Sequence, residues 1–212
     1  LKIDGADITL TSDANGEWLP AAVISPLAPI LLQARQAMAA NPANPDFSSL
    51  PDWRIGSITL RNAKLRVIEA GGAQNLISAL DVRVAWPGTT DPLQVTGAGV
   101  WRGQEFGLSA NFGNPVQMAA GGSGGLKASF NSQEATFEFD GVANLNRVFF
   151  ANGEVKFETP SMGALLDWLG AQMDAGASMG KMALSAKLVT KDDKMNFDDA
   201  VTALADVTGG DR

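Results

Sequence analysis

A two-residue alternation of apolar and polar side chains runs through residues 54–161 and limits the folds that this chain can adopt. In the segment EATFEFDG, for example, Ala135, Phe137 and Phe139 alternate with polar residues. Such alternation is typical of β-strands that have one buried face and one solvated face. The segments between the runs are short, which favours antiparallel pairing of consecutive strands. We therefore predict a mainly β (α+β) fold, a long curved antiparallel β-meander with two short amphipathic helices against its apolar face.

The positions of the alternating apolar residues predict the individual strands. Residues 58–86 read as three strands separated by the turn-like RNAK and by AGGAQN. The opening segment LKIDGADITL reads as one strand, and MNFDDAV reads as another after the turn KDDK. The other strands are marked by Phe106, Leu108, Ala110 and Phe112, by Leu126, Ala128 and Phe130, by Val155 and Phe157, and by Met182, Leu184, Ala186 and Leu188.

Two segments change to helical periodicity. Ser25 and Pro26 suit the N-cap and first position of a helix that we expect to reach about Ala40. Residues 41–53 follow as a loop, because their closely spaced prolines break any helix or central strand. Ser161 suits the N-cap of the second helix. The expected apolar stripes are Leu27, Ile30, Leu31, Ala34 and Met38 on the first helix, and Met162, Leu165, Leu166, Leu169 and Met173 on the second.

The apolar face of this sheet is larger than the helices can cover. Roughly ten strands at about 4.8 Å spacing give a sheet about 48 Å wide. Two helices, each about 10 Å across, cover something like half of that width. The rest must be covered by curling of the sheet, by a neighbouring protein segment or by an apolar ligand, and the sequence leaves these alternatives open.

Composition excludes several classes of function. The 212 residues include no cysteine and no histidine, so disulfides, thiolate sites and histidine-based catalysis or metal binding are ruled out. The formal net charge is -7, and no basic stripe is present for a phosphate backbone. We expect no nucleic acid partner, no metal, no cofactor and no enzyme activity. We read residues 1–212 as a single β-rich domain.

Two sequence patterns resemble a phosphate-binding loop and an acidic catalytic or metal site, but their neighbouring residues do not fit either kind of site. The run AAGGSGGLK is followed by a strand-like LKASF, whereas a phosphate loop leads into a helix, so we read it as a flexible connection. The acidic pairs Asp192 and Asp193, and Asp198 and Asp199, are neighbours in sequence, and neighbours on a strand point to opposite faces. We therefore expect no catalytic residue among them.

Several segments, taken in order, resemble the C-terminal region of the AsmA family. They are EATFEFDG, then GEVKFETPSMGALLDWLG and DAGASMGKMALSAKL, and upstream SITLRNAKLRVIEAGG, ISALDVRVAWPG and VWRGQEFGLSANFGNP. The resemblance covers the chain from about Arg54 onward. The chain opens on Leu1, and its apolar run AAVISPLAPILL is interrupted by two prolines and too short to span a bilayer. We therefore read the chain as a fragment of a longer, membrane-anchored protein.

The resemblance implies a function as well as a fold. AsmA-like proteins are bacterial periplasmic proteins, anchored to the inner membrane by a helix that this chain lacks. They are associated with outer-membrane biogenesis and resemble bridge-like lipid transfer proteins. It follows that the expected ligand is a phospholipid or another acyl chain, held in a β-sheet groove.

The candidate groove residues combine the apolar strand positions with one helix residue. They are Phe106, Leu108, Phe112, Phe137, Phe139, Val155, Phe157 and Trp168. Phe106, Phe137 and Phe139 are each expected to be partly exposed. Trp168 lies at the margin of the apolar stripe of its helix, where it could pack in the core or contact a ligand. The main alternative is a structural or assembly module that binds envelope protein partners. A hydrolase acting on envelope glycans or lipids is disfavoured by the missing histidine.

Overall fold

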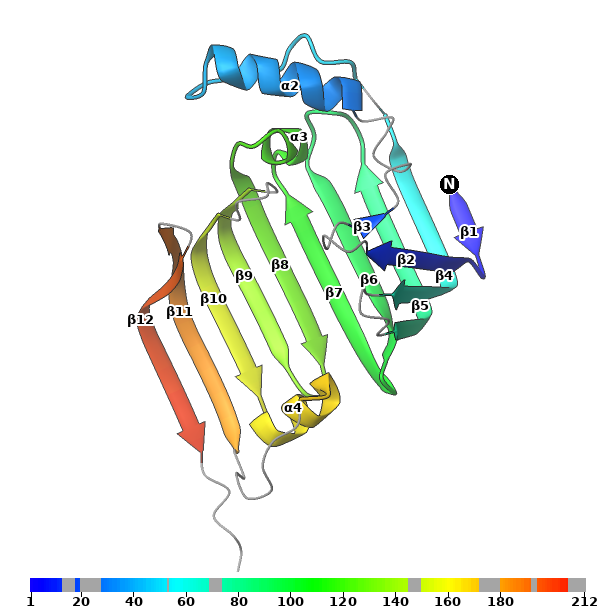
Figure 1. Ribbon diagram of the computed structural model, residues 1–212, viewed down its shortest axis with the longest axis vertical. Helices are drawn as coiled ribbons and strands as arrows, with labels where there is room; N and C mark the ends of the chain where they lie inside the picture. Colours follow the sequence, from blue (N-terminus) through cyan, green and yellow to red (C-terminus); the bar gives the residue numbers. More distant parts are fainter. Residues whose placement is uncertain are drawn as a thin grey trace, which may run out of the picture.

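The protein is built around one twelve-stranded sheet, described by a computed structural model. The structure describes residues 1–12, 18–19, 28–52, 54–68, 74–144, 150–171, 180–191 and 194–205. From β4 to β12, each strand pairs antiparallel with the next along the chain (Figure 1). The strands are β1 (Lys2–Asp4), β2 (Asp7–Ser12), β3 (Trp18–Leu19), β4 (Gly56–Ile68), β5 (Gln74–Trp86), β6 (Leu93–Trp101), β7 (Gln104–Phe112), β8 (Gly124–Ser132), β9 (Thr136–Ala143), β10 (Ala151–Thr159), β11 (Lys181–Lys191) and β12 (Lys194–Ala205). The predicted mainly β fold with a long curved meander is confirmed.

The opening segment departs from the prediction of one strand in the meander. It is broken at Gly5, whose φ of 68° is readily adopted only by glycine. The two pieces, β1 and β2, both pair parallel with β4 along successive parts of its length. The long strand β4 therefore pairs with both short strands, β1 and β2, along the same side.

The predicted turn at RNAK is also wrong, because β4 runs through it as a single strand with a bulge. The pairing of β4 with β5 shifts register between Leu60 and Ala63. Asn62 and Ala79, one on each strand, have φ of 47°, and the Asn62 amide donates a 2.8 Å hydrogen bond to the Asp81 carboxylate. Because bulges bend and twist strands, the far parts of β4 and β5, together with β2, turn across the direction of the other strands (Figure 1).

The helices lie at the two ends of the strands and not across the middle of the sheet (Figure 1). They are α2 (Ala28–Ala40) and α3 (Pro115–Ala119) at one end and α4 (Met162–Leu169) at the other. The predicted helix near residues 26–40 is confirmed from residue 28, whereas Ser25, Pro26 and Leu27 lie outside the described residues. Helix α3 was not predicted. Nothing among the described helices has the length and apolarity required to cross a membrane.

The α2 end is closed by its own small core. Ile30 and Ala34 from the predicted stripe are buried there with Trp86 and Val116. Phe47 and Leu50, from the loop after α2, pack against this cluster. Residues 41–52 form no helix or strand, as predicted, and Trp53 lies outside the described residues.

Helix α4 begins as predicted and ends earlier. The Ser161 hydroxyl accepts a 3.2 Å hydrogen bond from the amide of Ala164, as an N-cap does. Gly170, with φ of 78°, ends the helix in the left-handed conformation, and Met173 lies outside the described residues. Leu165 and Trp168 are the buried residues of the helix, whereas Leu169 of the predicted stripe is exposed.

Candidate functional site

The strand register places the seven candidate groove residues from the sheet on one face. Residues directly opposite each other on paired strands point to the same side. Phe137 lies opposite both Phe130 and Phe157, and Phe139 lies opposite Val155. The remaining pairs on this face include Leu108 with Phe130, Phe112 with Leu126, and Phe106 with Gly99. This side of the sheet is called the apolar face below.

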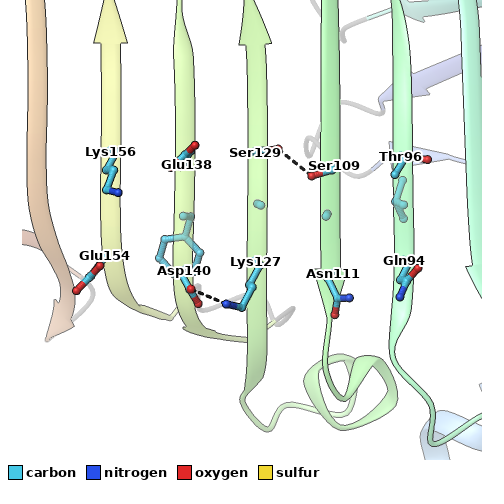
Figure 2. Close-up of a pocket in the computed structure, with 14 residues that line it drawn as sticks. Gln94, Thr96, Ser109, Asn111, Lys127, Ser129, Glu138, Asp140, Glu154 and Lys156 are labelled. Atoms are coloured by element: carbon cyan, nitrogen blue, oxygen red, sulfur yellow. Dashed lines mark hydrogen bonds and ion pairs between the residues drawn. The ribbon is translucent and has the colours of Figure 1, made fainter.

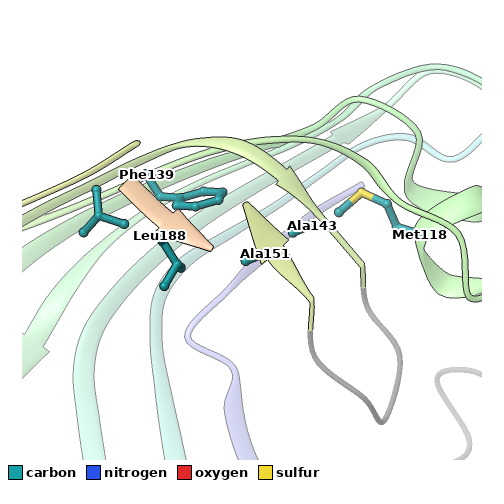
Figure 3. Packing of buried hydrophobic residues seen from close by; sticks show 6 residues of the cluster. Met118, Phe139, Ala143, Ala151 and Leu188 are labelled. Atoms are coloured by element: carbon teal, nitrogen blue, oxygen red, sulfur yellow. The ribbon is translucent and has the colours of Figure 1, made fainter. Parts of the chain in front are cut away.

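Exposure varies widely along this face. Phe106 and Phe139 are only 8% and 7% exposed, whereas Phe137 is 37% exposed. The expectation that all three are partly exposed is therefore wrong for Phe106 and Phe139. Phe139 is buried in a cluster with Val155 and Leu188 that reaches Met118 of α3 (Figure 3).

Glycines explain how a phenylalanine can be buried on a single-layer sheet. The ring of Phe106 lies 3.2 Å from the place where a Cβ on Gly99 would stand, and the ring of Phe139 lies 2.8 Å from the same point on Gly141. Leu108 covers Gly97 in the same way, at 3.4 Å. The large side chains thus lie flat over strand positions that have no side chain. We call this layer the glycine floor: Gly97, Gly99 and Gly141 with the side chains of Phe106, Leu108 and Phe139 above them.

Trp168 fixes α4 onto the end of the apolar face. Its ring meets Trp101 edge to face at 4.8 Å and stacks on Phe130 at 6.4 Å. Its indole nitrogen donates a 3.1 Å hydrogen bond to the carbonyl of Trp101. The guanidinium of Arg102 lies 5.0 Å from the Trp101 ring and donates to the carbonyl of Trp168 at 2.9 Å. Trp168 is therefore a core residue of the helix contact and also lines the hollow described next.

A hollow of about 360 Å³ lies between α4 and the apolar face, and only apolar residues line it. Its walls include Ile77 of β5 and Phe157 of β10. Five strand spacings separate these strands, about 24 Å in a flat sheet, so the sheet curls around the hollow. The lining residues are Ile77, Trp101, Phe106, Phe130, Ala135, Phe137, Phe157, Leu165, Trp168 and Leu169.

A polar pair lies near the α4 contact. The Gln104 amide donates a 2.9 Å hydrogen bond to the carboxylate of Glu134, which is buried. The side-chain carbonyl oxygen of Gln104 is buried and has no hydrogen-bond partner among the residues that the structure describes.

The opposite face of the sheet is polar and carries charged side chains of both signs (Figure 2). Lys127 and Asp140 form a 2.7 Å ion pair, and the hydroxyls of Ser109 and Ser129 are 2.8 Å apart. These residues line a shallow depression of about 540 Å³. The charges are exposed and of mixed sign, which is typical of a solvated face.

The acidic pairs gather no catalytic or metal-binding group among the described residues. Asp192 and Asp193 lie outside that part of the chain. Asp199 occupies a bulge with φ of 50° and lines a polar depression with Lys187, while Asp198 lies opposite Lys187. The register shift between β11 and β12 interrupts the alternation at Asp199. No set of three carboxylates close enough to hold a metal ion occurs in the described ranges.

Comparisons with known proteins add no assignment. No family model matches the chain, and no curated protein or solved structure is significantly similar to it.

Sequence reasoning missed part of this site. Ile77, Trp101 and Phe130 line the hollow but were not among the candidate residues. The glycines at alternate positions in LQVTGAGVW were the available signal, since glycine inside a strand often marks a close approach by another group.

Proposed function

We propose that this chain is a non-enzymatic lipid-binding segment whose apolar face holds acyl chains. The observation that carries the proposal is the hollow beneath α4, which is lined only by apolar residues and opens beside the exposed Phe137. An apolar hollow of this kind is typical of sites for apolar ligands. The polar headgroup of such a ligand would remain in water.

The total exposed surface supports the same proposal. The accessible surface of the chain is 13429 Å², whereas a compact monomer of 22.1 kDa exposes about 9,300 Å². The single-layer sheet contributes to the excess, because within the described ranges no helix lies across the middle of its apolar face (Figure 1). Large exposed apolar surfaces on soluble proteins mark sites that bind another apolar body.

The resemblance to the AsmA family supplies the cellular setting of the proposal. In that setting the ligand is a phospholipid acyl chain, the compartment is the periplasm, and the segment belongs to a protein anchored to the inner membrane. The segment would contribute one part of a longer path for lipid transport toward the outer membrane.

Lipid extraction followed by mass spectrometry on two matched variants tests the proposal. Phe137→Ser and Val142→Ser both alter β9, at side chains that are 37% and 42% exposed. Phe137 lines the hollow, whereas Val142 pairs with Gly125 and Asn152 on the polar face. We expect the purified protein to carry lipid, Phe137→Ser to lose most of it, and Val142→Ser to keep it. Absence of bound lipid from the parent protein, or equal loss in the two folded variants, would contradict the proposal.

A further inference from the structure

The outer edge of β12 differs from the rest of the sheet because every side chain of residues 194–204 is exposed. The strand is 12 residues long, contains no proline, and stands last in the strand order. No other strand in the described part of the chain pairs with its outer side. The bulge at Asp199 and the charges of Lys194, Asp198 and Asp199 protect the middle and one end of this edge. The backbone amides and carbonyls on either side of the bulge can still pair with another strand.

Exposed apolar side chains are concentrated on this strand. Met195, Phe197 and Leu204 are 54%, 51% and 75% exposed, and they lie on the apolar face opposite Thr190, Leu188 and Met182 respectively. Val201, on the polar face, is 70% exposed. A further strand beside β12 would cover these residues from the side.

The charges on β12 indicate what kind of strand fits. Asp198 lies opposite Lys187 of β11, and Phe197 lies opposite Leu188. The inner neighbour of β12 is thus an amphipathic strand with a lysine opposite Asp198. The outer side of β12 offers the same carboxylates and the same apolar row, and opposite charges across paired strands are stabilising whereas like charges are destabilising.

The same carboxylates disfavour a second copy of this chain. Asp198 and Asp199 lie in the middle of β12. Antiparallel pairing of two β12 strands over their full length would gather four carboxylates around the symmetry axis. Like charges at such close range oppose that dimer.

From these observations we propose that β12 is a docking edge for a β-strand of a separate protein. The partner strand is amphipathic, with apolar residues at alternate positions and a lysine or arginine opposite Asp198 and Asp199. It adds antiparallel to β12 by backbone hydrogen bonds and extends the apolar face by one strand. This interaction is independent of whether the apolar face binds lipid.

A peptide with the sequence of β11, KMALSAKLVTK, is a suitable probe because it already has the required pattern. It is labelled with a fluorophore and titrated with the full chain, with anisotropy as the measure of binding. The control peptide carries Lys187→Glu. We expect it to bind about tenfold more weakly, because the attraction between the lysine and the carboxylates of β12 becomes a repulsion between like charges. Amide hydrogen exchange should slow in β12 alone when the parent peptide binds.

Two protein variants locate the binding edge. Val201→Lys adds a positive charge to β12 at an exposed position and should weaken peptide binding about tenfold. Val142→Lys adds the same charge to the polar face of β9 and should leave binding unchanged. Both substitutions replace exposed side chains, so both variants should fold.

Four results would overturn the proposal. They are a dissociation constant for the parent peptide weaker than about 1 mM, equal binding of the two peptides, equal effects of the two protein variants, and loss of amide protection in β11, which would show that the peptide replaces that strand. A dimer of the free chain that Val201→Lys dissociates would assign the edge to a second copy instead. A monomer that binds the parent peptide and protects β12 supports the proposal.

Discussion

Phe139 of the glycine floor and Phe197 of β12 both lie on the apolar face of the sheet, yet their side chains differ in exposure. Phe139 is buried over Gly141 on a strand paired on both sides, whereas Phe197 is half exposed on β12, which has one paired neighbour among the described strands. Both residues follow the same apolar and polar alternation in the sequence. Alternation therefore determines which face a side chain joins, and the neighbouring strands and glycines determine how far it is covered.

The largest expected effect compares the two phenylalanines directly. Phe139→Ala should lower the free energy of unfolding by about 3–5 kcal/mol, because it empties a buried site. Phe197→Ala should lower it by less than about 1 kcal/mol, since half of that side chain is already in water. Denaturant unfolding of both variants measures the difference. Equal losses would mean that the floor and the edge are packed alike.

The next largest effect tests whether the close backbone contact between Gly153 and Gly141, beneath Phe139, contributes to stability. A Cβ on Gly153 would stand 2.5 Å from the carbonyl oxygen of Asp140 and 2.6 Å from the Cα of Gly141. Backbone atoms cannot move aside as a flexible side chain does, so Gly153→Ala should destabilise by about 1–3 kcal/mol. Gly125→Ala is the control, because nothing lies within 4 Å of its added carbon. A melting temperature lowered no more by Gly153→Ala than by Gly125→Ala would rule out this account of the floor.

A smaller effect is expected at the bend that curls the apolar face. Asp81→Ala removes the acceptor for the Asn62 amide in the bulge and should destabilise by about 0.5–1.5 kcal/mol. Asp81→Asn keeps an acceptor oxygen and should recover most of that loss. Amide exchange at Asn62 reports the bond directly. Unchanged exchange in Asp81→Ala would show that the carboxylate does not hold the bulge.

The smallest effect is expected on the polar face. Lys127 and Asp140 form an exposed ion pair, and pairs of this kind contribute about 0–1 kcal/mol. Lys127→Ala should therefore change the free energy of unfolding by less than about 0.5 kcal/mol, and less at high salt. Chemical unfolding at low and high salt checks this value. A loss of unfolding free energy as large as that of Phe139→Ala would contradict the assignment of the Lys127 face as the solvated face.

Much of the architecture could be predicted from local sequence. Alternation located β7 to β12 of the meander, and Ser161 located the start of α4, because both depend on neighbours in the chain. Strand β6 (Leu93–Trp101) was not predicted, because Gly97 and Gly99 take apolar-face positions without an apolar side chain. The bulge at Asn62 was read as a turn, since RNAK has the polar composition that both features share. The parallel pairing of β1 and β2 with β4 depends on contacts far apart in sequence, and no local pattern encodes it.

The candidate site was predicted less completely. The face shared by Phe106, Phe137 and Phe139 follows from periodicity, but the burial of Phe106 and Phe139 depends on glycines in the same or a neighbouring strand. Ile77 reaches the hollow only because the sheet curls. Curling follows from bulges and left-handed residues, which periodicity does not reveal.

The location of a bound acyl chain tests the central claim most directly. Stearate carrying a nitroxide on its chain is added to protein with labelled isoleucine, leucine and valine methyl groups, and paramagnetic broadening is measured by NMR. We predict strong broadening at Ile77 and Leu108 of the apolar face and at Leu165 of α4, and clearly weaker broadening at Val142 and Val201, which are exposed on the polar face. Absence of broadening, or equal broadening on the two faces, would contradict the proposal that the apolar face binds acyl chains.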